Sequence, residues 1–219
     1  LIILAVTFWL LGYRWESKLV RPKTGKKPLV SILIPAYNSK KSIGETLESV
    51  KNLDYPKKEI IVANDSKDSL QKICKQYNAK LIQNGKRLGK ALALNRAVEQ
   101  ARGEILFFVD ADTVVSKDCL TNLIPWLSNP KISAVSPKYT VKNPHNILTR
   151  LIGIEHYFLS TLFKVHMFLG SMISFRGCGV AIRKSTFEKL GGWPQTLIED
   201  TDLAAKMVRA GHVVQYEPK

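Results

Sequence analysis

Cysteine is scarce in this chain of 219 residues, which has only Cys74, Cys119 and Cys178. Their number is odd and they form no Cys-x-x-Cys or Cys/His cluster, so neither a disulfide framework nor a zinc site is indicated. The four histidines show no metal-ligand spacing either. These absences favour a protein of a reducing compartment.

Acidic residues are also few, since 18 Asp and Glu oppose 33 Lys and Arg and leave a formal net charge of +15. Such an excess favours contact with anions, whether phosphates, acidic lipid surfaces or nucleic acid. No internal repeat or low-complexity tract occurs. A hydrophobic content of 45% and a charged content of 23% are typical of a globular protein with a packed core, in one large domain or two small ones.

The uncharged segment that opens the chain, residues 1–13, is shorter than the roughly 20 residues that a membrane-spanning helix needs. The next segment, residues 14–27, has six basic residues and one acidic residue. A basic flank predicts that the following domain is cytoplasmic. We therefore expect the end of a transmembrane helix at 1–13 and a basic cytosolic linker at 14–27, with a signal-peptide core or a buried helix as the alternatives for 1–13.

The first half of the remaining chain alternates between apolar runs and helix-forming segments. Expected strands cover residues 29–34, 59–63, 80–83 and 105–109, and expected helices cover about 42–52, 69–77 and 90–102. The first helix begins at Ser42-Ile-Gly-Glu45, which has the spacing of a capping box. This alternation predicts an α/β fold with a mainly parallel, Rossmann-like central sheet flanked by helices on both faces.

The second half is less regular. We expect strands over 132–141 and 172–182, and helices over 147–169 and 199–210. The apolar helix 147–169 is expected to pack against the sheet, with a place at a membrane surface as the alternative.

Ligands of parallel α/β sheets bind at the carboxyl ends of the strands. Asp110 and Asp112 follow the fourth expected strand, and their spacing places both carboxylates on one face, where they can share a divalent cation bound to a diphosphate. The alternative is a polar strand end that caps the next helix. Asn64-Asp65, after the second strand, suits a nucleotide base or ribose, although Asx residues also form turns there.

The segment 84–90 resembles a phosphate-binding loop but is not a P-loop, because three residues rather than four separate Gly85 from Gly89 and Ala91 replaces the Ser or Thr. Its cations, which include Arg87 and Lys90, lie at the start of a helix and suit a diphosphate. The alternative is a solvated basic turn. The acidic residues of segment 198–202 look like ordinary helix caps. Trp193 suits either a sugar-stacking role or the core.

Taken together, the motifs resemble those of the inverting family 2 glycosyltransferases of the GT-A fold, especially the membrane-embedded synthases of cellulose, hyaluronan, chitin and poly-N-acetylglucosamine. The matching segments run from about residue 28 to the end and are Val30-Ser-Ile-Leu-Ile-Pro-Ala-Tyr-Asn38, Ile60-Ile-Val-Ala-Asn-Asp65, Gly89-Lys-Ala-Leu-Ala-Leu-Asn95, Val109-Asp-Ala-Asp112, Phe175-Arg-Gly-Cys-Gly179 and Thr196-Leu-Ile-Glu-Asp-Thr-Asp-Leu203.

The resemblance implies a GT-A catalytic domain over residues 28–219 and a role for each matched position. Residues implied to bind the nucleotide sugar are Pro35, Ala36, Tyr37, Asp65, Lys90, Asp110 and Ala111. Asp112, with Asp110, is implied to hold Mg²⁺ or Mn²⁺. Gly177 and Cys178 correspond to the acceptor segment, and Asp200, next to Glu199, corresponds to the general base. The implied partners are a nucleotide-sugar donor, a UDP-sugar by the same resemblance, and a saccharide or lipid-linked acceptor, at the cell membrane with the catalytic domain in the cytoplasm.

Three departures from the family pattern concern Asn64 in place of Asp, Ile198 in place of Thr, and a chain that stops before the Gln-x-x-Arg-Trp element. Two other classes compete with this interpretation. A sugar-phosphate nucleotidylyltransferase is expected to have a glycine-rich loop after the first strand, and residues 35–38 contain no glycine. A nucleic-acid-binding module would fit the net charge, but the lysines are dispersed and no recognition motif occurs, so we expect no nucleic acid partner.

Overall fold

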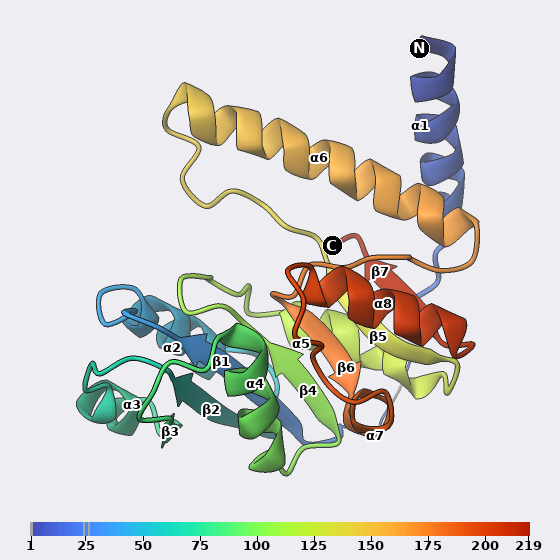
Figure 1. Ribbon diagram of the computed structural model, residues 1–219. Coiled ribbons are helices and arrows are strands. Elements are labelled where there is room, and N and C mark those ends of the chain that lie inside the picture. Colours follow the sequence, from blue (N-terminus) through green and yellow to red (C-terminus); the bar gives the residue numbers. More distant parts are fainter. Residues whose placement is uncertain (1, 24, 26) are drawn as a thin grey trace.

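The computed structural model describes residues 2–23, 25 and 27–219, and in them one seven-stranded sheet lies between layers of helices (Figure 1). The strand order is β3-β2-β1-β4-β6-β5-β7. The strands are β1 Val30–Ala36, β2 Lys58–Asn64, β3 Lys80–Gln83, β4 Ile105–Phe108, β5 Ile132–Pro137, β6 Val180–Arg183 and β7 Val213–Glu217. The helices are α1 Ile2–Ser17, α2 Ile43–Lys51, α3 Gln71–Gln76, α4 Lys90–Glu99, α5 Cys119–Leu123, the 3₁₀ helix η1 Ile124–Ser128, α6 Ile147–Phe168, α7 Lys184–Lys189 and α8 Glu199–Arg209.

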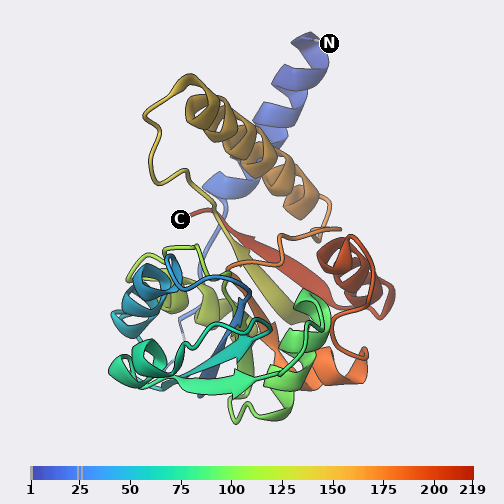
Figure 2. The same cartoon turned by 60° about the vertical axis from the view of Figure 1, so that its left-hand side comes forward.

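Side chains of the central strands alternate between two hydrophobic cores on opposite faces of the sheet. Ile32 and Phe107 belong to the core under α2, α3 and α5, whereas Leu33 and Phe108 belong to the core under α4, α7 and α8. Because successive side chains of a strand point to opposite faces, a strand covered on both sides must be apolar at every position. The two helical layers are seen on either side of the sheet in Figure 2.

Parallel pairing dominates, as the sequence predicts. β1 pairs in parallel with β2 and β4, and β2 pairs with β3, while β6 runs antiparallel between β4 and β5. Since β1, β2 and β4 share one direction, their carboxyl ends meet at one edge of the sheet. This edge carries the polar residues discussed below.

Two local predictions are wrong. The strand expected over 172–182 is formed only by β6, because the preceding segment is a loop in which Gly179 has a φ of 68° and its N–H donates to the carbonyl of Phe108. The capping box expected at Ser42 does not form, since Ser42 has helical dihedrals and makes no side-chain capping bond. The Glu45 side chain instead pairs with Lys142. A capping box occurs at Asn146 and Thr149, where α6 begins.

The helix α1 begins inside the segment expected to be the end of a membrane span and continues to Ser17. It packs beside the last turns of α6, where Lys164 forms an ion pair of 2.7 Å with Glu16 (Figure 1). Residue 1 of the expected span and residues 24 and 26 of the expected linker lie outside the described residues. Of the helices that the structure describes, none combines the length and the apolarity required to cross a bilayer.

The expectation that α6 packs against the sheet holds only for its C-terminal half. There Phe163 and Met167 join the core, and Ser160 shares a hydrogen bond of 2.6 Å with Tyr216. The N-terminal half extends beyond the sheet with exposed apolar side chains (Figure 1). These side chains are Ile147, Leu148, Leu151, Ile154, Tyr157 and Phe158.

Gly103, which precedes β4, is expected to be intolerant of any side chain. A Cβ there would lie 2.6 Å from the backbone N of Ser31 and 2.8 Å from the carbonyl of Leu29. Gly103→Ala should therefore lower the free energy of unfolding by about 2–3 kcal/mol, measured by urea denaturation. Gly25→Ala is the matched control, because a Cβ at that position meets no described atom within 4 Å. Equal midpoints for Gly103→Ala and the wild-type protein would contradict this packing.

Candidate active site

A cavity of about 560 Å³ opens at the carboxyl ends of β1, β2 and β4. It is lined by every residue that the sequence assigns to the nucleotide sugar and the metal: Pro35, Ala36, Tyr37, Asp65, Lys90, Asp110, Ala111 and Asp112. The remaining lining residues are Asn38, Ser39, Ser42, Arg87, Gly89 and Ala93. Of these, Ser39 belongs to no motif, Ser42 was expected only as a helix cap, and Ala93 lies in the matched segment Gly89–Asn95 without an assigned role.

Asp65 organises the loop that borders this cavity. Its Oδ2 accepts hydrogen bonds of 2.7 Å from the backbone N–H groups of Leu88 and Gly89, and its Oδ1 accepts one of 3.0 Å from the side chain of Asn84. The carboxylate is buried, so these bonds replace the water that it would otherwise bind. The segment 84–89 is thus held as a defined turn against β2, in front of the first residue of α4.

Arg87 and Tyr37 face each other at the mouth of the cavity. The guanidinium carbon of Arg87 lies 4.5 Å from the centre of the Tyr37 ring, within the range of a cation–π contact. Tyr37 is 47% exposed, so one side of this pair is open to a ligand. A planar base can stack on such a ring, while the guanidinium supplies charge to a phosphate.

Lys90 stands deeper, at the start of α4. Its Nζ lies 2.7 Å from Oδ1 of Asp110. Burial disfavours the charged amine, but the carboxylate of Asp110 outweighs that cost and raises the pKa of Lys90 above its ordinary value, with a smaller contribution from Glu199. Lys90 is therefore a permanent cation at neutral pH, and a diphosphate in the cavity would find it charged.

Asp110 and Asp112 present carboxylates to the same cavity from the end of β4. In the described residues no group of three or more His, Cys, Asp and Glu side chains comes together as a metal site. Two hard oxygen donors nevertheless fit Mg²⁺ or Mn²⁺, because these ions complete their coordination with substrate phosphate oxygens and water. Lys90 occupies Oδ1 of Asp110, which leaves Oδ2 and the exposed Asp112 for such an ion.

Cys178 connects this edge to the second half of the chain. Its Sγ accepts a hydrogen bond of 3.3 Å from the backbone N–H of Asp110 and lies 3.2 Å from Oγ1 of Thr113. Burial and the charge of Asp110 raise the pKa of the Cys178 thiol. The thiol is thus neutral at physiological pH, and its contacts make it a link between two loops rather than a nucleophile.

The neighbouring Gly177 holds Asp200. The N–H of Gly177 donates to Oδ2 of Asp200 at 3.0 Å, and Oδ1 accepts from the backbone N–H of Thr201 at 2.7 Å. A Cβ on Gly177 would lie 3.8 Å from Oε1 of Glu199, so both acidic residues stand beside this glycine. A continuous set of contacts therefore runs from Asp110 through Cys178 and Gly177 to Asp200. These last residues, with Glu199, adjoin the cavity and are not among those that line it.

The structure decides between the alternatives for Trp193 and draws attention to Arg176. Trp193 belongs to the core rather than to a sugar site, because it is 2% exposed and its ring packs edge-on against Phe108, Phe175 and Phe187. Arg176 lies in the matched segment Phe175–Gly179, but the resemblance assigns it no role.

A family model for glycosyl transferase family 2 matches residues 31–191. The chain belongs to glycosyl transferase family 2. Among its relatives in this family, a poly-beta-1,6-N-acetyl-D-glucosamine synthase of Staphylococcus epidermidis is 31% identical over 212 residues, covering 93% of this chain and 52% of the relative. The Staphylococcus aureus synthase of the same name is 30% identical over 229 residues, covering 96% and 56%. The chain thus spans about half the length of these relatives.

Solved structures support the same fold. A mannosyltransferase of Pyrobaculum calidifontis, in complex with GDP-Man and Mn²⁺, superposes with a TM-score of 0.81 and 28% identity over 98% of this chain and 62% of its own. S. aureus TarS in complex with UDP-GlcNAc gives a TM-score of 0.64 at 21% identity, over 87% of this chain and 58% of its own. The predicted GT-A glycosyltransferase fold is confirmed by these neighbours, and the family 2 assignment by the family match.

Proposed function

We propose that this family 2 domain transfers a sugar, with inversion, from a nucleotide-diphosphate sugar to a hydroxyl of a saccharide or lipid-linked acceptor. The observation that carries the proposal is the set of contacts from Asp110 through Cys178 and Gly177 to Asp200. It supports a single reaction centre that combines carboxylates suited to a metal with one carboxylate suited to a base.

The donor half of the proposal rests on the cavity lined by Tyr37, Arg87, Lys90, Asp110 and Asp112. The base of the nucleotide would stack on Tyr37, and its diphosphate would lie against the cations of Arg87 and Lys90. Asp110 and Asp112 would hold Mg²⁺ or Mn²⁺, which neutralises charge on the departing diphosphate. Two of the solved neighbours were crystallised with Mn²⁺, which supports this choice of ion.

The acceptor half rests on Asp200. In an inverting transfer the acceptor oxygen bonds to the anomeric carbon from the face opposite the diphosphate, and the bond from that carbon to the diphosphate breaks. One carboxylate must take the proton of the attacking hydroxyl. Asp200 suits this role because the hydrogen bonds from Gly177 and Thr201 fix its orientation.

The nucleoside of the donor is predicted to be uridine, in line with the UDP-GlcNAc complex of TarS, whose sugar is the N-acetylglucosamine named in the poly-beta-1,6-N-acetyl-D-glucosamine synthases among the relatives. The GDP-Man complex of the mannosyltransferase supplies the competing choice. Titration calorimetry with UDP-GlcNAc, UDP-glucose and GDP-mannose in Mn²⁺ tests this. We expect a UDP-sugar to bind at least about tenfold more tightly than GDP-mannose, or about 1.4 kcal/mol. Equal or tighter binding of GDP-mannose would overturn the uridine prediction and leave sugar transfer intact.

The domain boundaries and the cellular location belong to the same proposal. Residues 1–13 would be the end of a transmembrane helix, 14–27 a basic cytosolic linker and 28–219 the catalytic domain, on the cytoplasmic side of the cell membrane. The support for this location is the exposed apolar surface of α1 and α6 and the basic residues between α1 and β1.

A further inference from the structure

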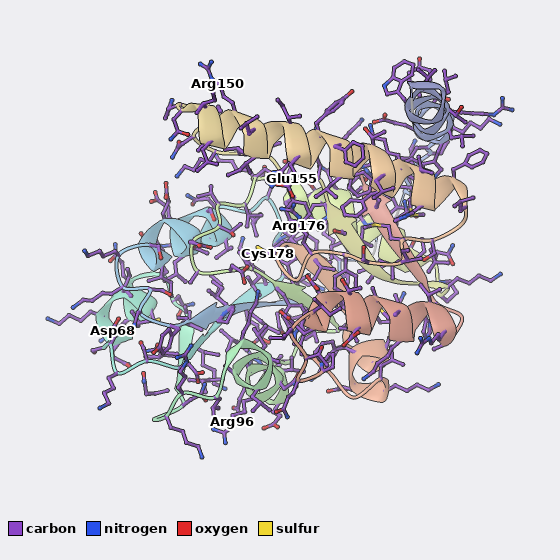
Figure 3. All side chains as sticks on the ribbon, turned by 45° about the horizontal axis from the view of Figure 1, so that its top comes forward. Asp68, Arg96, Arg150, Glu155, Arg176 and Cys178 are labelled. Atoms are coloured by element: carbon purple, nitrogen blue, oxygen red, sulfur yellow. The ribbon has the colours of Figure 1, made fainter. Side chains whose placement is uncertain are left out.

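Arg176 is a cation beside the proposed base that the donor site does not use. It directly precedes Gly177, whose N–H holds Asp200. Its Nη1 lies 2.9 Å from Nε2 of His156 on α6, and its guanidinium carbon lies 5.2 Å from the centre of the Tyr139 ring. Figure 3 shows Arg176 between α6 and Cys178, on the α6 side of the loop.

The charge of Arg176 is not neutralised by any carboxylate of the described residues within ion-pair distance. Burial and the nearby guanidinium lower the pKa of His156, while Glu155 opposes this weakly, so His156 is neutral and Nε2 can accept from Arg176. Arg176 is partly exposed, its one side-chain hydrogen bond among the described residues is the one to His156, and its Nε and Nη2 are not buried atoms without a partner. The guanidinium therefore keeps donors that a ligand can reach.

Arg176 lies outside the cavity proposed for the donor. Arg87 and Lys90 line the nucleotide-sugar cavity, and Arg176 does not. It stands instead at Gly177 and Cys178, the segment assigned to the acceptor. A neutral saccharide could accept hydrogen bonds from this guanidinium but would leave its charge uncompensated, whereas a phosphate would neutralise the charge and accept two parallel N–H bonds from its fork.

The helix that contacts Arg176 also offers an apolar surface. Ile154, Tyr157 and Phe158, which flank His156 on α6, are each 65% exposed. Side chains of this kind on an amphipathic helix suit the hydrocarbon chain of a lipid or the boundary of a bilayer. The helix α6 thus contacts the unpaired cation of Arg176 and also offers an apolar surface that suits a lipid chain.

We propose that Arg176 binds the phosphate of a lipid-linked saccharide acceptor, so that a hydroxyl of that saccharide meets Asp200 while the lipid chain lies along α6. This inference rests on the proposed function and names its acceptor class. The hydroxyl oxygen bonds to the anomeric carbon, its proton passes to Asp200, and the nucleoside diphosphate leaves with the electron pair of the broken bond. Arg176 takes no proton and acts on acceptor binding.

The experiment compares acceptors with and without the anion, using the full-length protein. Initial rates are measured with UDP-GlcNAc and GDP-mannose as donors. The acceptors are prenyl-diphosphate-linked N-acetylglucosamine or mannose and alkyl glycosides of the same two sugars. Arg176→Gln should raise KM for the phosphate-linked acceptor by about 10- to 100-fold, with kcat and donor affinity little changed, and leave KM for the alkyl glycoside unaltered.

Two further variants separate binding from structure. Arg176→Lys keeps the charge and should recover part of the lost affinity. Arg96→Gln removes an equal charge from an exposed position on α4, outside both the donor cavity and α6 (Figure 3), and should behave like the wild-type protein. An equal loss with both acceptors in Arg176→Gln, not recovered by lysine, would reduce Arg176 to a structural clamp and overturn the proposal.

The remaining assays show whether the phosphate is bound or is itself the nucleophile, and whether the acceptor class or the whole proposed function is wrong. If bare prenyl phosphate is glycosylated and Asp200→Asn leaves that rate unchanged, the phosphate itself is the nucleophile and the saccharide part of the proposal is wrong. If alkyl glycosides serve the wild-type protein as well as phosphate-linked ones, the acceptor class is wrong while sugar transfer stands. Absence of donor binding in calorimetry would instead remove the proposed function.

Discussion

Asp200→Asn is expected to abolish transfer while the protein still binds its donor. The amide keeps the size of the carboxylate and one acceptor oxygen for the N–H of Gly177 and loses only the bond from the adjacent Thr201, so the loop should hold its shape. It cannot take a proton from the acceptor hydroxyl. We expect kcat to fall by about 10²- to 10⁴-fold, with the Kd of the nucleotide sugar changed by less than about twofold.

Turnover assays and calorimetry on the same preparation measure the two effects. Asp202→Asn is the matched control, since Asp202 lies in the same first turn of α8 and makes no contact with Gly177 among the described residues. It should lower kcat only slightly. Full turnover in Asp200→Asn, or an equal loss in Asp202→Asn, would show that the base lies elsewhere.

Asp112→Ala has the second large expected effect, on donor binding. Asp112 presents an exposed carboxylate to the cavity, and no other described side chain holds it in an ion pair. If it holds the cation on the diphosphate, its loss should weaken donor binding in Mn²⁺ by about 10²-fold. Titration with the nucleotide sugar in Mn²⁺ and again in a chelator isolates the metal-dependent part, which should be small in the variant.

Asp54→Ala serves as the control for this measurement, because Asp54 is an exposed aspartate outside the cavity. It should bind the donor as the wild-type protein does, with the same gain from Mn²⁺. If Asp112→Ala kept the full metal dependence, Asp110 with other ligands would have to hold the cation, and the assignment of Asp112 would be wrong.

The sequence predicts well which residues meet at the carboxyl ends of β1, β2 and β4, for a physical reason. β1, β2 and β4 are buried on both faces, so each is a continuous apolar run with a sharp end, and the polar residue after that end is easy to locate. Because these strands are parallel neighbours in the sheet, their carboxyl ends meet at one edge, and no long-range contact has to be predicted to bring them together. Asp65, Asp110 and Asp112 therefore line one cavity, as expected.

The acceptor half is not encoded in local patterns. Glu199 and Asp200 look like helix caps, and only the family resemblance marks Asp200 as a base. Its position beside Cys178 depends on the antiparallel pairing of β4 with β6, whose partners are more than 70 residues apart. Apolar residues such as Met172 and Phe175 make segment 172–179 resemble a strand. Both side chains are buried in the core, but the backbone that carries them is a loop. Arg176 lies in the motif Phe175–Gly179, but the sequence assigns it no role, because its partners Tyr139 and His156 meet it only in three dimensions.

The antiparallel insertion of β6 between β4 and β5 also sets an order of assembly for a chain that emerges from the ribosome. The units that build the donor cavity end at Asp112 and rely on short crossovers, so they can form while the later segments are still being made. Until β6 arrives, β4 is an open edge. The strand that closes this edge follows Gly177 and Cys178 after one intervening residue, so the nascent protein would position its proposed acceptor segment in the same event that closes its sheet.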